Sequence, residues 1–151
     1  MGRAALKKCL ARQVSIEIAS LPYNSALLEW LESQRATGRE LLLVTAADES
    51  LANQVADHLG LFDRVIASDG RQNLKGKRKV ESLRQQVTGE FEYVGNSWSD
   101  LDIWRHSANS ITVGSSRSLL KRVKEFAPGT ISFDGRSGRL KGWRAALRVH
   151  Q

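Results

Sequence analysis

The sequence predicts an α/β fold of the layered, Rossmann-like kind with a mainly parallel sheet. Short apolar runs typical of buried strands alternate with segments of helical periodicity, and the connections between them are short. Such alternation is typical of βαβ units. The chain has 151 residues, of which 41% are hydrophobic and 26% are charged, so it is long and apolar enough to bury a core.

The first half of the chain carries local signals for three helices and two strands. Asn24 is a suitable helix N-cap, and Gly38 is a suitable stop for the same helix. A continuous apolar run then predicts a strand buried on both faces. The expected elements are helices over 1–19 and 25–36, a strand over 41–46, a helix from Asp48 to Gly60 and a strand over 64–67.

The second half repeats the alternation of strands and helices. Val80, Leu83 and Val87 recur on one face of a predicted helix, and Ser99 is expected to cap a short helix. The expected elements are a helix over 77–87, a strand over 92–95, the short helix after Ser99, a strand over 110–114, a helix over 118–126, a strand over 130–133 and a basic amphipathic helix over 140–149.

The positive charge is concentrated at the end of the chain. Residues 1–114 carry 14 basic and 14 acidic side chains, whereas residues 115–151 carry 9 basic and 2 acidic ones, which accounts for the net charge of +7. This distribution is typical of a neutral domain with a basic tail and argues against a uniformly basic nucleic-acid binder. The single cysteine, Cys9, excludes an internal disulfide framework and a cysteine-rich zinc site.

The sequence contains no run of about 18 apolar residues that would predict a membrane span. The first residues are charged and no long apolar stretch follows them, so they do not resemble a signal peptide. We therefore expect a cytoplasmic location.

Three polar features follow predicted strands, at the edge where ligands bind in open α/β sheets. Thr45 ends the strand over 41–46, and the loop over 95–100 ends in Asp100. Lys75 and Lys79 lie in a basic segment that opens the next helix. A hydroxyl, a carboxylate and a lysine together suit a phosphate with a divalent cation.

Each of these residues also has an ordinary interpretation. Thr45 is a β-branched residue that fits any buried strand. Asp100 can stabilise a helix N-terminus through the helix dipole. The basic segment with Lys75 and Lys79 can be a solvated helix face.

The order of these motifs resembles the haloacid dehalogenase superfamily over residues 21–126. The resemblance rests on Leu43-Val44-Thr45-Ala46-Ala47-Asp48, the lysine segment and Val94-Gly95-Asn96-Ser97-Trp98-Ser99-Asp100-Leu101. It is closest to the phosphoserine-phosphatase-like branch found fused ahead of UbiA-type polyprenyl transferases. Asp57-His58-Leu59-Gly60-Leu61-Phe62-Asp63, Ala67-Ser68-Asp69-Gly70 and Asn73-Leu74-Lys75-Gly76 resemble that branch in particular.

The resemblance implies a Mg²⁺-dependent phosphatase acting on a phosphorylated small molecule. Thr45 and Lys79 would be its catalytic residues, with Lys75 as the other candidate lysine. Thr45, Ala46 and Lys79 would bind phosphate. Asp100 and Asn96 would hold the metal, although Asn96 replaces an acidic residue of the family and adds no charge.

The aspartate nucleophile of this family is missing from the matched region. The family attacks phosphorus with an Asp-x-Asp-Gly-Thr motif on its first strand, and no such motif precedes Thr45. Residues 1–20 instead resemble the end of the helical cap, and residues 21–128 the core. We therefore expect a core without its first strand and most of its cap, inactive as it stands. Ser132-Phe133-Asp134-Gly135 echoes the motif but has serine at the nucleophile position.

The missing strand is central in the family, between the strands over 41–46 and 92–95. Its absence would leave unpaired backbone groups on both neighbours. We expect these two strands to pair directly, or the slot to be filled by a second copy of the chain or by residues 130–134. A homodimer formed by strand exchange is one consequence.

The basic segment over 129–151 suggests an alternative function. Its last residues, 140–151, resemble the stretch before the first membrane helix of the fused transferases. The resemblance implies an extension lying on an anionic, cytoplasmic membrane surface. The chain would then be a non-catalytic regulatory or packing module beside a transmembrane prenyltransferase. Binding of nucleic acid ranks last, because the tail carries no recognised motif.

Overall fold

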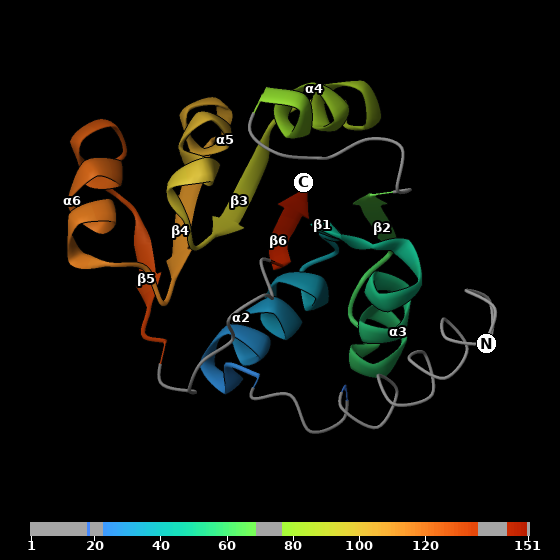
Figure 1. Cartoon of the computed structure of the whole chain (residues 1–151). Coiled ribbons are helices and arrows are strands. Elements are labelled where there is room, and N and C mark those ends of the chain that lie inside the picture. Colours follow the sequence, from blue (N-terminus) through green and yellow to red (C-terminus); the bar gives the residue numbers. More distant parts are fainter. Residues whose placement is uncertain (1–17, 19–22, 69–76, 136–144, 151) are drawn as a thin grey trace, which may run out of the picture.

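Six strands form one sheet with helices on both faces in the computed structural model, which describes residues 18, 23–68, 77–135 and 145–150 (Figure 1). The elements in chain order are α2 (Ser25–Ala36), β1 (Glu40–Asp48), α3 (Glu49–Leu59), β2 (Arg64–Ser68), α4 (Lys77–Gln86), β3 (Phe91–Gly95), the 3₁₀ helix η1 (Trp98–Asp100), α5 (Leu101–His106), β4 (Asn109–Val113), α6 (Arg117–Phe126), β5 (Ile131–Phe133) and β6 (Ala145–His150). The predicted helix over 1–19 lies almost wholly outside the described residues.

The sheet has the strand order β2-β1-β6-β3-β4-β5. β1 pairs in parallel with β2, β3 with β4, and β4 with β5, whereas β6 runs antiparallel to both β1 and β3. The prediction of an α/β fold with a mainly parallel sheet is therefore confirmed.

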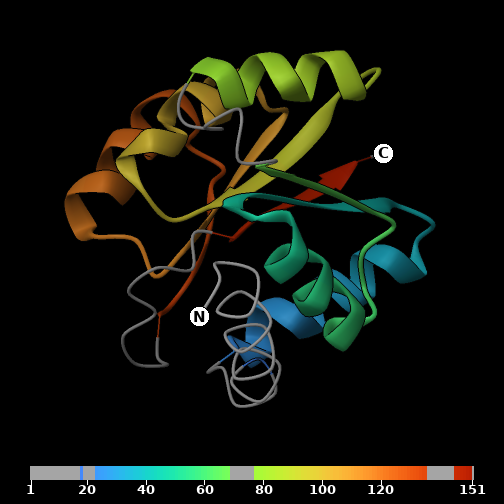
Figure 2. The same ribbon diagram turned by 45° about the vertical axis from the view of Figure 1, so that its right-hand side comes forward.

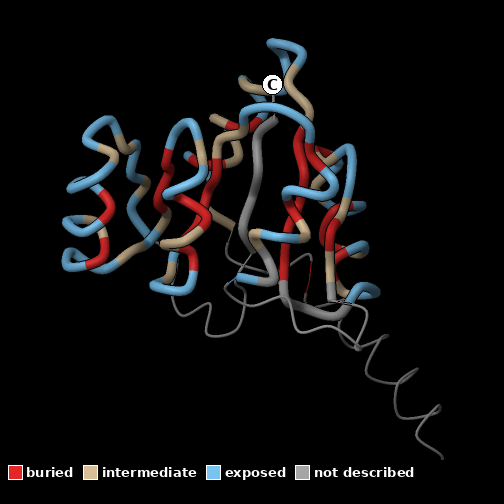
Figure 3. The backbone as a smooth tube through the Cα atoms, turned by 90° about the horizontal axis from the view of Figure 1, so that it is seen from above, coloured by how far each residue is buried: buried red, intermediate tan, exposed pale blue. Residues whose placement is uncertain are grey.

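Helices cover the sheet on both sides, in three layers (Figure 2). α2 and α3 lie on one face, and α4, α5 and α6 lie on the other. Buried residues lie along the strands and on one side of the helices (Figure 3). The core under α2 and α3 contains Leu27, Leu31, Leu41, Leu43, Val55, Val94 and Ile111. The core under α4, α5 and α6 contains Leu42, Val44, Leu83, Tyr93, Trp104, Leu119 and Val123.

Local signals explain the elements that the sequence predicts well. The side chain of Asn24 accepts a hydrogen bond from the Leu27 N–H at 3.0 Å, so α2 begins at the predicted cap. After α2, Gly38 adopts a positive φ of 88°, which favours glycine. Four consecutive residues of β1, Leu41 to Val44, are fully buried, as expected for a strand covered on both faces.

The centre of the sheet differs from the prediction. Residues 145–150 form the strand β6 between β1 and β3, where the sequence predicts part of a helix over 140–149. The strands over 41–46 and 92–95 are therefore not direct neighbours, and β5 lies beside β4 at the edge rather than in the slot. Strand pairing outweighs helical periodicity here because β1 and β3 would otherwise bury unpaired backbone groups.

Two strands therefore come from the segment over 129–151 that the sequence sets apart as a basic extension. β5 adds an edge strand and β6 joins the two halves of the sheet. In the described part of the chain, no helix combines the length and apolar character needed to cross a membrane.

An ion pair bridges the two strands that flank β6. The guanidinium of Arg39, directly before β1, lies 2.9 Å from the carboxylate of Glu92 in β3. Both side chains are largely buried, with exposed fractions of 19% and 13%. Asn109 donates a second hydrogen bond to Glu92 at 2.7 Å. The amino-terminal edge of the sheet is thus tied across the slot that β6 fills.

Candidate functional site

Thr45 lies near the carboxyl end of β1, as the sequence predicts. It pairs with Ala145 of β6, and the residue is 1% exposed. The β1 backbone continues through Ala46 to Asp48, with an irregularity after Val44 in its pairing with β2. Thr45 is therefore a buried hydroxyl at the edge of the sheet where α/β proteins bind ligands.

The second predicted part of the site is the loop after β3. β3 ends at Gly95, and η1 begins at Trp98 with Ser97 as its N-cap. The helix α5, for which the sequence predicts Ser99 as the cap, has Asp100 at its N-cap position instead. The two serine hydroxyls lie 2.7 Å apart. The loop thus turns the chain sharply from the strand into η1 and α5.

Asp100 organises this loop from within. Its Oδ2 accepts hydrogen bonds from the backbone N–H groups of Asn96 and Ser97, both at 3.1 Å, and from the Ser97 hydroxyl at 3.3 Å. Its Oδ1 accepts a hydrogen bond from the Tyr93 hydroxyl at 3.1 Å. Asp100 is only 4% exposed. The carboxylate therefore satisfies donors that the turn would otherwise bury without partners.

Gly95 makes this close packing sterically feasible. A Cβ at this position would lie 2.8 Å from Asp100 Oδ2 and 2.9 Å from both the Trp104 Cζ2 and Tyr93 Cε1 atoms. Real Cβ atoms do not approach other atoms so closely. The absence of a side chain at Gly95 thus allows the carboxylate and both aromatic rings to meet above the end of β3.

The sequence does not reveal the part that Tyr93 and Trp104 play in this loop. Their rings make an edge-to-face contact at 6.3 Å, and the Trp104 indole donates to the Tyr93 carbonyl oxygen at 3.2 Å. Both residues are buried. One sequence signal could have indicated the role of Tyr93. It stands two residues before Gly95, and residues two apart in a strand lie on the same face of the sheet, so its ring lies on the side of that glycine.

The structure brings Thr45 and the β3 loop to the same edge, on opposite sides of β6. β1 and β3 each pair antiparallel with β6 and are therefore parallel to each other. The registers place Thr45 level with Asn96, one residue past the end of β3. Two strand spacings separate β1 from β3, which corresponds to about 10 Å. A phosphate group fits within such a span.

The structure describes the two predicted phosphate-binding lysines less completely than Thr45 and Asp100. Lys79 lies in the first turn of α4, which follows β2, and its side chain is outside what the structure describes. Lys75 falls in 69–76, also outside the described residues. The phosphate roles predicted for the two lysines remain predictions.

The described residues do not form a good Mg²⁺ site. Both oxygens of Asp100 are engaged by the four donors above, and a carboxylate has about four acceptor positions. Asn96 is exposed, but an amide oxygen contributes no charge. Within the described ranges, no group of three or more His, Cys, Asp or Glu side chains is placed to hold a metal.

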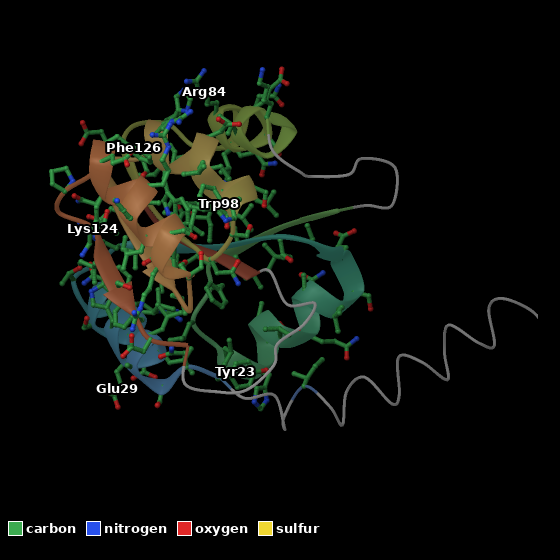
Figure 4. All side chains as sticks on the ribbon, turned by 60° about the vertical axis from the view of Figure 1, so that its left-hand side comes forward. Tyr23, Glu29, Arg84, Trp98, Lys124 and Phe126 are labelled. Atoms are coloured by element: carbon green, nitrogen blue, oxygen red, sulfur yellow. The ribbon has the colours of Figure 1, made fainter. Side chains whose placement is uncertain are left out.

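Trp98 is the conspicuous exposed residue of the loop (Figure 4). The residue is 54% exposed, whereas Trp104 in α5 is buried. Its indole ring is therefore available at the surface next to Asn96 and Ser99, and it is a natural fluorescence reporter for this edge of the sheet.

The comparisons with known proteins find one relative, whose function is not described. The chain is 38% identical over 152 residues to the uncharacterized protein y4nM of Sinorhizobium fredii. The match covers 99% of this chain and 29% of that protein, so the chain spans less than a third of the relative's length. No family model matches the chain. No solved structure matches it either.

We expect the loop to depend on the carboxylate of Asp100. Asp100→Ala removes the acceptor of four hydrogen bonds and should lower the free energy of unfolding by about 3 kcal/mol. Tyr93→Phe removes one of these bonds and should lower it by about 1 kcal/mol. Urea denaturation followed by tryptophan fluorescence measures both. Equal, small effects would contradict the organising role of Asp100.

We also expect Gly95→Ala to destabilise the protein by about 1–3 kcal/mol, because the added methyl group overlaps three side-chain atoms. Thermal unfolding measures the effect. Gly129→Ala is the matched control, since nothing lies within 4 Å of its added Cβ. A Gly95→Ala variant as stable as the control would show that the close packing relaxes freely.

Proposed function

We propose that this chain is a core of the haloacid dehalogenase type that binds a phosphorylated small molecule without hydrolysing it. The binding position is the carboxyl-terminal edge of the sheet between β1 and β3. Thr45 supplies a hydroxyl, Ala46 a backbone N–H, and Lys79 or Lys75 the balancing positive charge.

One observation carries the proposal. Thr45 and the loop over Gly95–Asp100 follow two parallel strands that flank a single strand, so both features lie at one edge, about 10 Å apart. Phosphate groups bind at this edge in open α/β sheets, where backbone N–H groups and helix N-termini point outward. The helix α4, which carries Lys79, follows β2 along the chain, and β2 is parallel to β1.

The same arrangement supports binding rather than turnover. The family uses a carboxylate beside the phosphate as the attacking group. The strand next to Thr45 is β6, and its residues, Ala145 to His150, include no aspartate or glutamate. Asp100 is engaged by its own loop. The neighbouring strand and loop therefore offer no free carboxylate for attack.

The first test measures binding of inorganic phosphate by isothermal titration calorimetry. We expect Thr45→Val, which keeps the side-chain shape and removes the hydroxyl, to weaken phosphate binding at least tenfold, because a hydrogen bond to a charged group is lost. Unchanged binding by Thr45→Val would overturn the proposed position.

Thr112→Val is the matched control. Thr112 is another fully buried strand threonine, in β4, and its hydroxyl has no hydrogen-bond partner among the described residues. The control should bind phosphate as the natural chain does and should be more stable by about 1 kcal/mol, because an unsatisfied hydroxyl is removed from the core.

The second test is an assay of para-nitrophenyl phosphate hydrolysis with and without Mg²⁺. We expect no turnover above background in either condition. Turnover that disappears in Asp100→Ala would show that the chain contains its own attacking group and that Asp100 leaves its loop contacts, and it would contradict the non-hydrolytic function.

A further inference from the structure

A pocket lies at the amino-terminal edge of the sheet, at the opposite end of the strands from Thr45 and the loop after β3. It is found where the ends of α5 and α6 meet the beginnings of β4 and β5, and its volume is about 280 Å³. Its lining includes Trp104, Arg105, Asn109, Ser110, Phe126 and Thr130. This volume is at the lower end of the range for ligand pockets and suits a small molecule.

Ser110 brings a buried hydroxyl to this pocket. The residue is 3% exposed, and its Oγ has no hydrogen-bond partner among the described residues. Ser110 pairs with Tyr93 in the β3–β4 register, and cross-strand neighbours share a face, so it lies on the side of the sheet that α4, α5 and α6 cover. Buried hydroxyls are normally paired, because an unpaired one is destabilising. The Ser110 hydroxyl therefore points to a polar group that binds in the pocket.

Arg105 supplies a positive charge to the same pocket. Its Cζ lies 5.6 Å from the centroid of the exposed Phe126 ring, which is labelled in Figure 4, and this cation–π contact holds the side chain over the end of α6. Its contact with the Asp102 carboxylate is 3.9 Å long, which is beyond hydrogen-bond distance. The guanidinium therefore keeps N–H donors for a ligand, and their planar arrangement matches a carboxylate.

The other polar side chains of the pocket offer acceptors. The hydroxyls of Ser107 and Thr130 each donate to a backbone carbonyl oxygen, at 2.9 Å and 2.6 Å, and the amide of Asn109 donates to Glu92 at 2.7 Å. The oxygen of each of these three side chains can still accept a hydrogen bond. The carboxyl-terminal end of α6 adds a partial negative charge. These groups together favour a cationic donor.

We propose that this pocket binds an α-amino acid with a short side chain, in its zwitterionic form. The carboxylate pairs with Arg105, and the ammonium group donates to the oxygens of Ser107, Asn109 and Thr130. The buried hydroxyl of Ser110 gains its missing partner from the same ligand. A simple carboxylate would leave the acceptors without a donor, and a simple amine would leave Arg105 without an acceptor. The site is independent of the proposed phosphate position.

The test titrates the full chain, labelled with ¹⁵N, with L-alanine and follows the backbone amide signals by NMR. We expect the chemical-shift changes to concentrate at residues 104–110 and 126–130, which contain the pocket lining. Propionate is alanine without the ammonium group, and ethylamine is alanine without the carboxylate. Each should bind at least tenfold more weakly than alanine, because charged hydrogen bonds are lost.

Two variants locate the ligand. Arg105→Gln and Ser110→Ala should each weaken alanine binding at least tenfold. Ser110→Ala should not lower the thermal unfolding midpoint, since the hydroxyl has no partner among the described residues, so a loss of binding is not a loss of fold. The matched controls are Arg117→Gln, at an exposed position of α6, and Ser115→Ala, which removes another hydroxyl without a described partner. Both controls should bind alanine as the natural chain does.

Three results would overturn the proposal. The first is the absence of chemical-shift changes with alanine, or changes confined to other parts of the chain. The second is equal affinity for alanine and propionate, because the site would then recognise only an anion. The third is unchanged alanine binding by both Arg105→Gln and Ser110→Ala. Thr45→Val should leave alanine binding unaltered, because Thr45 lies at the other edge of the sheet, so this test and the phosphate test fail separately.

Discussion

Backbone pairing at the centre of the sheet is the constraint on which the rest of this structure depends. β6 joins the pair β2–β1 to the group β3–β4–β5, and its two ladders supply hydrogen-bond partners to strands that are covered on both faces. A buried peptide group without a partner costs about 1–3 kcal/mol. Several such groups along two strands would multiply this cost. Backbone pairing therefore outweighs the helical periodicity of residues 140–149.

The same constraint holds the two cores together. The core under α2 and α3 takes Leu43 from β1 and Val94 from β3, and the core on the other face takes Leu42 and Tyr93 from the same two strands. Each core therefore includes residues from both sides of β6, and each requires these strands to stay two spacings apart. The ion pair across the slot at the amino-terminal edge fixes this width as well.

The elements predicted well from the sequence are those whose signals are local. The helix over 25–36 has its predicted bounds because Asn24 caps it and a positive-φ glycine follows it. Residues 145–150 lack a comparable local signal. Their apolar residues fit a helical face as well as one face of a strand, and the pairing that decides between them involves residues about 100 positions earlier in the chain. Such non-local competition is not visible in a periodicity pattern.

The candidate site also has one part that local sequence signals predict and one part that depends on contacts between distant atoms. The position of Thr45 at a strand end follows from the apolar run before it, so the sequence predicts it. The role of Asp100 depends on a hydroxyl seven residues earlier, on β3, and on the small size of Gly95. The sequence leaves a metal role and a helix-stabilising role open for Asp100, and the observed contacts are those of a residue that holds a turn together.

The two parts of the candidate site, Thr45 and the loop after β3, differ because β6 pairs with β1 and β3 over different lengths. Its pairing with β1 extends to Thr45, whereas its pairing with β3 includes Phe91, Glu92 and Tyr93. Beyond Tyr93, the Asn96 N–H donates to the carboxylate of Asp100 and not to a neighbouring strand. Asp100 thus supplies a hydrogen-bond acceptor to the backbone just after β3, as β6 supplies backbone partners to β1 up to Thr45. A carboxylate engaged in this way is a weak basis for ligand binding, so the phosphate-binding proposal depends mainly on Thr45 and on the edge that β1 and β3 share.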